Sequence, residues 1–307
     1  MDYSKSEWLA SLPWPVPNST QMLDGESLAA FVVFAEQLNF TRAATMLHVS
    51  QPALHTRIRK LGEQLGVPLY RRVGRQLALT DAGREVVRFA RELEGRTREL
   101  HDALHGVRPS APVTLAAGEG SFLYLLGEPI RRFVRRGEAP LRLLTRDREQ
   151  TIEALRSGEA QLGVAALEVV PDDLECTSLC EVPQLLVMPT THPLARRRKI
   201  MLEQLAGERM IVAPRSRPHH QTFAKAMLAA GVRWEVAVET HGWPAMLHFV
   251  RLGVGLAIVN GSVKLPRGYV GRPVPELPTT RYWLLCAPRL SPAARALADL
   301  IQERAGQ

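Results

Sequence analysis

The sequence predicts an α/β protein made of an N-terminal winged helix-turn-helix, a long linker helix and a C-terminal region of two α/β lobes. Three observations lead to this prediction. Apolar residues first repeat at helical spacing, a seven-residue repeat follows, and strand-like segments then alternate with helices. We place a leader at 1–22, the winged domain at 23–80, the linker helix at 81–106 and a hinge at 107–112. The first lobe is assigned to 113–188 and 271–307, and the second lobe to 189–270.

The composition is that of an ordinary globular protein, with 46% hydrophobic and 23% charged residues in 307. No apolar run is long enough to cross a bilayer, and the leader does not have the pattern of a signal peptide. We therefore expect a cytoplasmic protein with no membrane partner. Cys176, Cys180 and Cys286 lack the spacing of a zinc site, and we predict no metal or cofactor. A redox pair of Cys176 and Cys180 is the alternative to structural thiols, although on one extended strand they would lie ~13 Å apart.

Three helices are predicted before the wing. The first spans 27–38, the second spans 42–47 with Thr41 as its N-cap, and the third starts at Gln51 with Ser50 as its N-cap. The third helix has an apolar face formed by Leu54, Ile58, Leu61 and Leu65. Its opposite face is polar, which is typical of a recognition helix that enters the major groove.

The polar face and the wing supply the candidate DNA contacts. Strands at 69–72 and 76–80, with Gly74 between them, predict a hairpin wing whose arginines contact phosphates. Residues 42–75 contain seven Lys/Arg and one acid, although ordinary solvated charges are the alternative explanation. The candidate DNA-binding residues are Thr41, Arg42, Ser50, Gln51, Pro52, His55, Thr56, Arg57, Arg59, Arg71, Arg72 and Arg75. Gln51 suits adenine, and Arg59 suits guanine or phosphate.

The stretch from Leu28 to Glu85, above all NFTRAATMLHVSQPALHTRIRKLGEQLGVPLYRRVGRQLALTDAGR, resembles the N-terminal domain of LysR-type transcriptional regulators. The sequence departs from the family at 55–57, where His-Thr-Arg replaces the common Ser-Arg-Gln. Gly62 also stands where an acid is common, and the leader before Leu23 is longer than usual. Because positions 55–57 lie on the DNA-reading face, the operator preference of the family is not carried over.

The linker helix carries a heptad stripe. Its two interleaved sets are Val86, Leu93 and Leu100, and Ala90, Thr97 and Leu104. Such a stripe is too narrow for the core of a monomer and favours a homodimer seam, with packing against the chain's own domain as the alternative. The family resemblance implies the same dimerising helix, and a homotetramer built from such dimers.

In the C-terminal region, strand-like segments alternate with helical segments, a pattern that predicts mostly parallel sheets. In the first lobe we expect strands at 113–117, 141–145 and 162–167, a loop at 118–121, and helices at 122–136, with a kink at Pro129 as an alternative to a straight helix, and 150–156. In the second lobe we expect strands at 210–213, 236–240 and 255–259, and helices at 218–230 and 243–251. A strand at 281–286 and a helix at 292–304 return to the first lobe.

This layout resembles the effector domain of the same family, which is similar to periplasmic solute-binding proteins. Ligands of such folds bind between the lobes, at strand C-termini and helix N-termini. The candidate effector-binding residues are Gly118, Gly120, Ser121, Phe122, Thr145, Arg146, Arg215, Arg217, His219, His220, His241 and Trp243. The arginines and histidines favour a small organic anion, although two adjacent histidines in a basic loop are often simply exposed.

The predicted function is sequence-specific, effector-controlled binding of double-stranded DNA, with RNA polymerase as a further candidate partner. A solute-binding protein is the first alternative, disfavoured by the missing export signal and by the segment before Gly106. An enzyme with an accessory helix-turn-helix is the second. We find no phosphate-cradling glycine motif, no nucleophile elbow and no metal-spaced His/Glu set, so we predict that the protein is not an enzyme.

Overall fold

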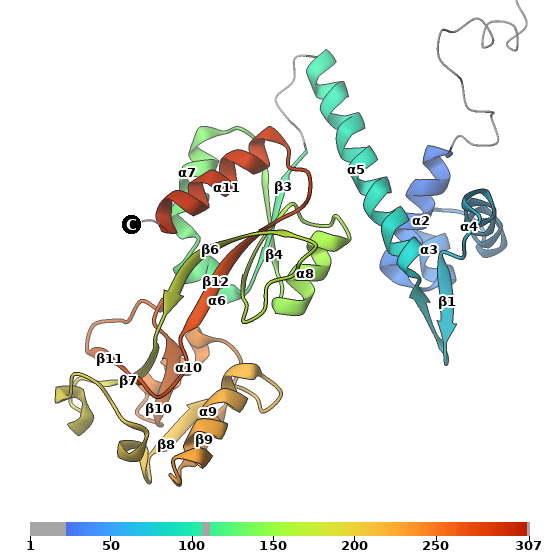
Figure 1. The fold of residues 1–307 in the computed structure, drawn as a ribbon. Coiled ribbons are helices and arrows are strands. Elements are labelled where there is room, and N and C mark those ends of the chain that lie inside the picture. Colours follow the sequence, from blue (N-terminus) through green and yellow to red (C-terminus); the bar gives the residue numbers. More distant parts are fainter. Residues whose placement is uncertain (1–22, 106–110, 306–307) are drawn as a thin grey trace, which may run out of the picture. The chain divides into compact units, whose positions relative to one another are not determined.

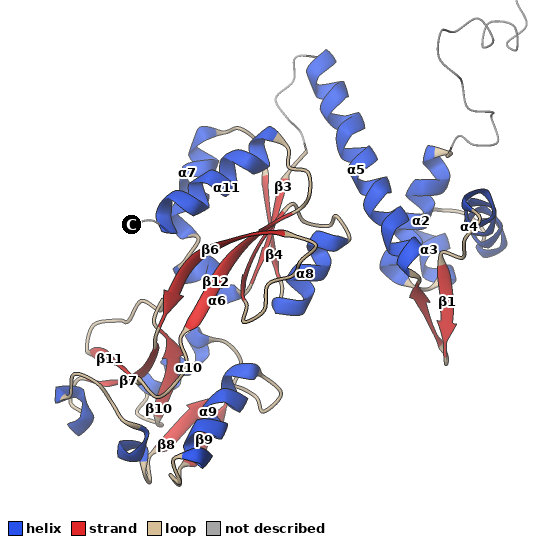
Figure 2. Ribbon diagram, viewed as in Figure 1, coloured by secondary structure: helices blue, strands red, loops and turns tan. Residues whose placement is uncertain are grey.

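A computed structural model describes residues 23–105 and 111–305, which form two compact units. Figures 1 and 2 show the elements of each unit, and each unit is described by itself. The predicted leader and most of the predicted hinge lie outside the described residues. Among the helices of the described ranges, none is long and apolar enough to cross a membrane.

The N-terminal unit is a winged helix-turn-helix followed by a long helix. Its elements are α2 (Gly25–Gln37), α3 (Phe40–Met46), α4 (Gln51–Leu65), β1 (Tyr70–Val73), β2 (Gln76–Leu79) and α5 (Asp81–Leu104). Phe31 and Phe34 of α2 and Leu54, Ile58 and Leu61 of α4 are buried at the centre of this unit. The predicted three helices, wing and linker helix are therefore confirmed.

The start of α3 differs from the prediction. Asn39, not Thr41, is the N-cap, and its Oδ1 accepts a hydrogen bond from the backbone N–H of Arg42 at 3.1 Å. The helix begins at Phe40 because this ring packs into the core, stacked on Phe34 with 4.3 Å between the ring centroids. Thr41 therefore lies in the first turn, where its side chain is free to face away from the core.

Thr80 joins the wing to α5. Its hydroxyl accepts from the N–H of Gly83 at 3.0 Å and donates to the carbonyl of Pro68 at 2.7 Å. Gly83 lies so close to the preceding loop that a Cβ atom there would overlap the carbonyl oxygen of Leu69. The Thr-Asp-Ala-Gly turn at 80–83 therefore requires glycine at its last position.

The C-terminal unit consists of two lobes, each built on a five-stranded sheet. Lobe 1 has the strand order β4-β3-β5-β12-β6, and lobe 2 the order β11-β7-β10-β8-β9. The lobe 1 strands are β3 (Val113–Ala117), β4 (Leu141–Thr145), β5 (Leu162–Ala166), β6 (Glu175–Val182) and β12 (Thr280–Cys286). Its helices are α6 (Glu119–Tyr124), α7 (Gly127–Arg136), α8 (Arg148–Arg156) and α11 (Pro292–Ala305).

Lobe 2 has strands β7 (Gln184–Pro189), β8 (Arg209–Val212), β9 (Glu235–Glu239), β10 (Leu256–Asn260) and β11 (Tyr269–Pro273). Its helices are α9 (Pro218–Ala229) and α10 (Trp243–Arg251), with short turns η1 (Pro193–Arg196) and η2 (Leu202–Leu205). Figure 2 shows these helices and strands together in one part of the C-terminal unit. The predicted two-lobed α/β architecture is confirmed.

Four details of the lobes correct the predictions. The sheets are mixed, because β12 pairs antiparallel with β5 and β7 pairs antiparallel with β10. The unpredicted strands β7 and β11 belong to the lobe 2 sheet, so the lobe limits at 188/189 and 270/271 are wrong by several residues. The expected helix at 122–136 is two helices, since Pro129 is compatible with the first turn of α7 but not with a helix interior. The expected loop at 118–121 contains the start of α6.

Cys176 and Cys180 both lie on β6, and neither forms a disulfide. The register against β12 shifts between Tyr282 and Trp283, so the side-chain alternation of β6 reverses between the two cysteines. Cys176 packs with the cluster around Leu285, and Cys180 packs with the cluster around Leu284 on the other face. Burial raises the pKa of the Cys176 thiol. This arrangement favours structural thiols over a redox pair.

Replacing Gly83 by Ala should destabilise the N-terminal unit by about 1–3 kcal/mol, because the new methyl group overlaps the carbonyl of Leu69. The matched control is Gly95→Ala on the same helix, where no atom lies within 4 Å of the new Cβ. Higher helix propensity should make this control more stable by about 1 kcal/mol. Urea unfolding followed by circular dichroism measures both variants, and equal stability of the two would contradict the packing argument.

Candidate DNA-binding and effector-binding sites

Helix α4 presents a polar face to solvent. Ser50 caps it, because its hydroxyl accepts from the N–H of Ala53 at 3.3 Å, as expected. The exposed residues of this face include Gln51, Pro52, His55, Thr56 and Arg59. The apolar side chains of α4 are buried against α2 and α3. The opposite, polar face of the helix is therefore free to enter a DNA groove.

Some of the candidate side chains already have partners. His55 Nε2 lies 3.2 Å from the hydroxyl of Tyr70, at the base of the wing. Arg57 is turned towards α2, with its guanidinium 3.5 Å from the carboxylate of Glu26. Arg59 lies 3.3 Å from Glu63 on the next turn of α4. The Thr41 hydroxyl lies 3.4 Å from Gln51 Oε1 and thus links the starts of α3 and α4. Arg42 is exposed.

The wing holds the other candidate cations. Arg71, Arg72 and Arg75 are exposed, and Arg71 and Arg72 point to opposite faces of the ribbon because they are adjacent on β1. Gly74 adopts φ +61° at the tip, a conformation that favours glycine. Arg72 Nε donates to the carbonyl of Gly74 at 3.2 Å, so its side chain lies along the turn. The predicted wing residues are therefore gathered on one hairpin.

The predicted seam on α5 divides into two parts. Ala90 is buried in the core of its own unit and Val86 packs against that core, so these two positions match the alternative of packing within the chain. Leu93, Leu100 and Leu104 are 40%, 61% and 74% exposed. Thr97 is exposed, and its hydroxyl donates to the carbonyl of Leu93. The second half of α5 thus keeps an uncovered apolar stripe.

A cavity of about 350 Å³ lies between the lobes of the C-terminal unit. Its walls come from the start of α8, the end of β5, the start of α9, and the segments that connect the lobes. Three of the predicted effector-binding residues line it, namely Arg217, His219 and Trp243. Its apolar walls include Phe223, Ile258 and Leu277. Its size and mixed lining suit a small organic ligand.

The residues at the start of α6 do not line this cavity. Gly118, Gly120, Ser121 and Phe122 lie in lobe 1 at the place where Trp243 of lobe 2 approaches. A Cβ atom on Gly120 would stand 3.0 Å from Cδ1 of the Trp243 indole. Ser121 is buried, and Phe122 packs against the lobe 1 core. The indole therefore occupies the space in front of α6 that we expected for a ligand.

The remaining predicted residues lie elsewhere. His220 is buried, with Nδ1 2.7 Å from the carbonyl oxygen of Ala213, so it does not face the cavity. Arg215, His241 and Thr145 are exposed outside the cavity lining. The guanidinium of Arg146 donates to the carbonyl of Thr145. These side chains were predicted around one ligand because they follow the ends of the right strands, but they do not line this cavity.

Several lining residues were missed by the sequence reasoning. Asp147, Arg148 and Glu149 follow β4 directly, so the rule that ligands bind at strand C-termini was sufficient to find them. Gln184 and Tyr282 belong to the connections between the lobes, where the assignment of the strands was incomplete. Burial raises the pKa of Tyr282 to about 12, which keeps its phenol neutral. The amide of Asn260 donates to this phenol oxygen.

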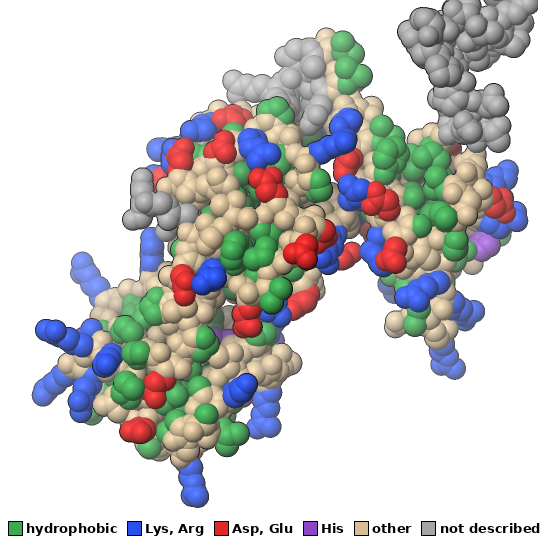
Figure 3. Space-filling view, viewed as in Figure 1, with side chains coloured by type: hydrophobic (Ala, Val, Ile, Leu, Met, Phe, Trp, Pro, Cys, Tyr) green, Lys and Arg blue, Asp and Glu red, His purple; other side chains and the backbone are tan. Residues whose placement is uncertain are grey.

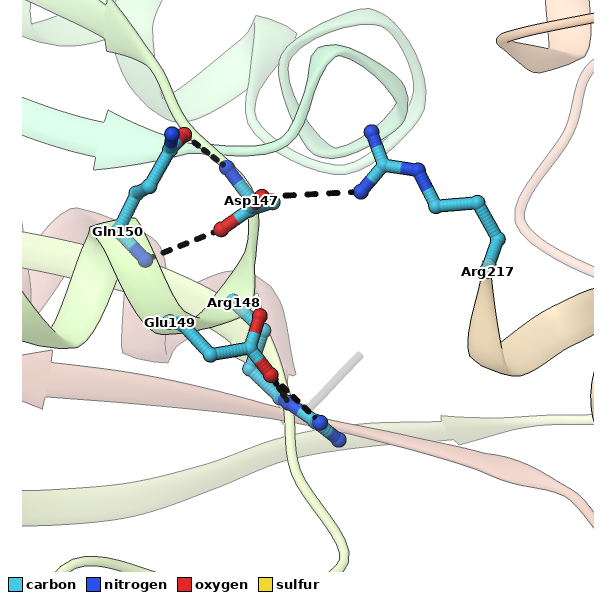
Figure 4. Close-up of polar contacts among 5 residues, drawn as sticks. All are labelled: Asp147, Arg148, Glu149, Gln150 and Arg217. Carbon is cyan, nitrogen blue, oxygen red and sulfur yellow. Dashed lines mark hydrogen bonds and ion pairs between the residues drawn. The ribbon is translucent and has the colours of Figure 1, made fainter. Parts of the chain in front are cut away.

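One ion pair crosses the cavity between the lobes. Asp147 Oδ2 of lobe 1 lies 3.7 Å from Arg217 Nη1 of lobe 2 (Figure 4). Asp147 is held in place because its carboxylate accepts from the N–H of Gln150 at 3.0 Å while Gln150 Oε1 accepts from the N–H of Asp147 at 3.2 Å. Arg148 is paired with Glu149 beside it. Arg217 therefore bridges the lobes with a long, partly exposed contact.

His219 is the most unusual polar group of the cavity. Both ring nitrogens are buried and have no hydrogen-bond partner among the described residues. The ring meets Trp243 edge-on, with 4.6 Å between the centroids. Burial lowers the pKa of His219 from its ordinary 6.5 to about 4, with a further contribution from His220. With this pKa the ring is neutral at pH 7 and carries no charge with which to neutralise an anion. Gln184 Oε1 is a second buried acceptor without a described partner.

Comparison with known families agrees with this architecture. Residues 26–84 match the model described as "Bacterial regulatory helix-turn-helix protein, lysR family", and residues 107–306 match the model described as "LysR substrate binding domain". The chain belongs to the LysR family of transcriptional regulators. It is therefore a DNA-binding regulator with an effector-binding domain, from a family of oligomeric regulators rather than of enzymes or solute-binding proteins.

Individual relatives are similar to this LysR-family regulator over most of its length. The HTH-type transcriptional regulator CatR of Pseudomonas putida is 34% identical over 246 residues, covering 77% of this chain and 82% of CatR. The RuBisCO operon transcriptional regulator of Allochromatium vinosum is 28% identical over 289 residues, covering 91% of this chain and 96% of that protein. A full-length OxyR variant from Pseudomonas aeruginosa has a similar fold, with a TM-score of 0.65 at 24% identity over 91% of this chain and 95% of that one.

The buried imidazole of the LysR-family regulator makes its stability depend on pH. In the unfolded chain the ring takes up a proton near pH 6.5, whereas in the folded protein it does so only near pH 4. The unfolded state thus binds more protons in this window, and the free energy of unfolding should fall by up to about 3 kcal/mol as the pH drops from 6.5 to 4. His219→Phe should remove this part of the dependence, and His241→Phe at an exposed position should retain it. Urea unfolding at several pH values distinguishes them, and the same slope in all three proteins would contradict the assignment.

Proposed function

We propose that this LysR-family regulator reads the bases of its operator with the exposed face of α4 and contacts the flanking phosphates with the arginines of the wing. Gln51, His55 and Arg59 set the sequence preference, whereas Arg71, Arg72 and Arg75 mainly set affinity. The support is the separation of the two faces of α4, since the apolar residues are buried and the polar ones are exposed. The protein acts in the cytoplasm, and RNA polymerase is its further partner.

Dimerisation through α5 completes this proposal. Leu93, Leu100 and Leu104 form the seam, and two dimers assemble into a homotetramer. The uncovered apolar stripe on the second half of α5 supports the seam, because such side chains gain by burial against a second copy. A twofold axis between two recognition helices suits an operator made of two related half-sites.

The effector in this proposal is a small organic anion that binds in the cavity between the lobes. The single observation that carries it is the Asp147–Arg217 pair, because 3.7 Å exceeds a hydrogen bond and leaves the guanidinium able to take a better anionic partner. His219 and Gln184 supply neutral hydrogen bonds to a polar group of the same ligand. Trp243 and Phe223 cover its apolar body.

Binding of such an anion changes the contact between the lobes. Asp147 and Arg217 come from different lobes, so a ligand that takes over Arg217 removes an interaction that favours the present arrangement. A ligand can shift the arrangement only by its difference in affinity for the two states. The linker helices then transmit the shift to the spacing of the recognition helices in the dimer.

If α4 sets the sequence preference and the wing sets the affinity, variants of the two elements should behave differently. Gln51→Ala should change the bases that are selected from a random duplex pool, since it removes a side chain that reads base edges. Arg72→Ala should weaken binding to all sequences alike and lower the slope of log K against log salt by about 1, because it removes one phosphate contact. Selection followed by sequencing and a salt titration measure the two effects. A changed base preference in the Arg72 variant would refute the assignment.

Replacing Arg217 by Gln should weaken binding of the anionic effector at least about tenfold, because the anionic group of the ligand loses its charged partner. The matched control is Arg215→Gln, which removes an exposed charge two residues away and outside the cavity lining. Organic acids that raise the melting temperature are first identified by screening and then measured by calorimetry beside their amides. The preference for acid over amide should vanish only in the Arg217 variant, and its persistence there would rule out this role.

A further inference from the structure

The positive charge of the protein is concentrated in lobe 2. Residues 184–277 contain thirteen Lys/Arg and five Asp/Glu, a net charge of +8 that equals the net charge of the whole chain. All other residues together, those of the DNA-binding unit among them, are therefore neutral in sum. Figure 3 shows Lys and Arg side chains projecting from this lobe at the lower left, with few acidic side chains between them.

The densest part of this charge is a loop of four consecutive cations, Arg196 to Lys199, all of them exposed. The loop is anchored at both ends, because the flanking Ala195 and Ile200 are buried. The guanidinium of Arg272 donates to the carbonyl of Ala195 at 3.1 and 2.8 Å, and the N–H of Ile200 donates to the carbonyl of Pro273 at 2.9 Å. The four charges are thus displayed from a fixed position.

These cations differ from those of lobe 1 in their surroundings. Arg131, Arg132 and Arg136 of α7 each have a carboxylate nearby, at 2.8, 2.9 and 3.6 Å respectively. For Arg196 to Lys199, no carboxylate of the described residues lies within ion-pair distance. Four adjacent like charges repel one another, and a polyanion is the partner that relieves this repulsion.

We propose that the Arg196–Lys199 loop of lobe 2 binds the phosphate backbone of DNA that flanks the operator. Phosphate contacts need only charge and no apolar surface, and the segment 194–200 exposes no large apolar side chain. A docked protein partner needs a dry apolar centre, which this loop does not offer. The inference rests on the proposed DNA binding by α4 and the wing, which holds flanking DNA at high effective concentration near the same molecule.

The test uses the full chain and two duplexes, one limited to the selected operator and one with several additional helical turns on each side. The triple variant R196Q/R197Q/R198Q should bind the short duplex like the wild type. On the long duplex its affinity should fall, and the slope of log K against log salt should decrease by about 0.9 for each phosphate contact that is lost.

The control variant R131Q/R132Q/R136Q removes the same charge from lobe 1 and should match the wild type on both duplexes. Equal binding of wild type and loop variant to the long duplex would overturn the inference, as would an equal loss in the control variant. Normal DNA binding with a lost transcriptional response would instead point to an acidic protein partner and equally overturn it. Failure of the wild type on the short duplex would count against the proposed function instead, so the two failures are distinguishable.

Discussion

The chain passes between the lobes twice, from β6 to β7 and from β11 to β12. A hydrogen bond joins these two connections, and the effector-binding unit depends on it. Gln184 Nε2 at the start of β7 donates to the hydroxyl of Thr280 at the start of β12 at 2.7 Å. Nearby, the amide of Asn260 donates to the phenol of Tyr282, so a lobe 2 strand is bonded to a lobe 1 strand. All four residues line the cavity. The candidate ligand site is therefore built around the part of the unit that both lobes share.

The elements that could be predicted from the sequence are those whose signal is local. Helix α4 has its cap, its proline and its apolar period within about fifteen consecutive residues, so its start and its inner face follow from the sequence alone. Strands β6 and β11 lack such a signal. The residues of β11 are all half-buried, and β6 contains a bulge, so neither shows regular alternation. Missing these strands and β7 displaced the predicted limits between the lobes.

The two candidate sites differ in the same way. The proposed DNA-reading face is one side of one helix, and its residues follow from the helical period. The candidate effector cavity joins residues from β5, α8, α9, α10 and both connections between the lobes, so it depends on tertiary packing. Trp243 shows most clearly why the sequence alone could not define the cavity. Its place after a lobe 2 strand suggested a cavity wall, and it lines the cavity, but only the structure shows that its indole packs against Gly120 in front of α6.

The distribution of positive charge along the chain is more informative than the net charge of the protein. The excess of cations at 42–75 is offset within the same unit by acids such as Asp81, Glu85, Glu92 and Glu94 of α5, whereas the cations of lobe 2 have few acids around them. Arg217 and the Arg196–Lys199 loop both belong to lobe 2. If both proposals hold, an effector that alters the arrangement of the lobes through Arg217 also moves this loop relative to lobe 1. Binding of flanking DNA and binding of the effector would then influence each other to the extent that each prefers one arrangement of the lobes.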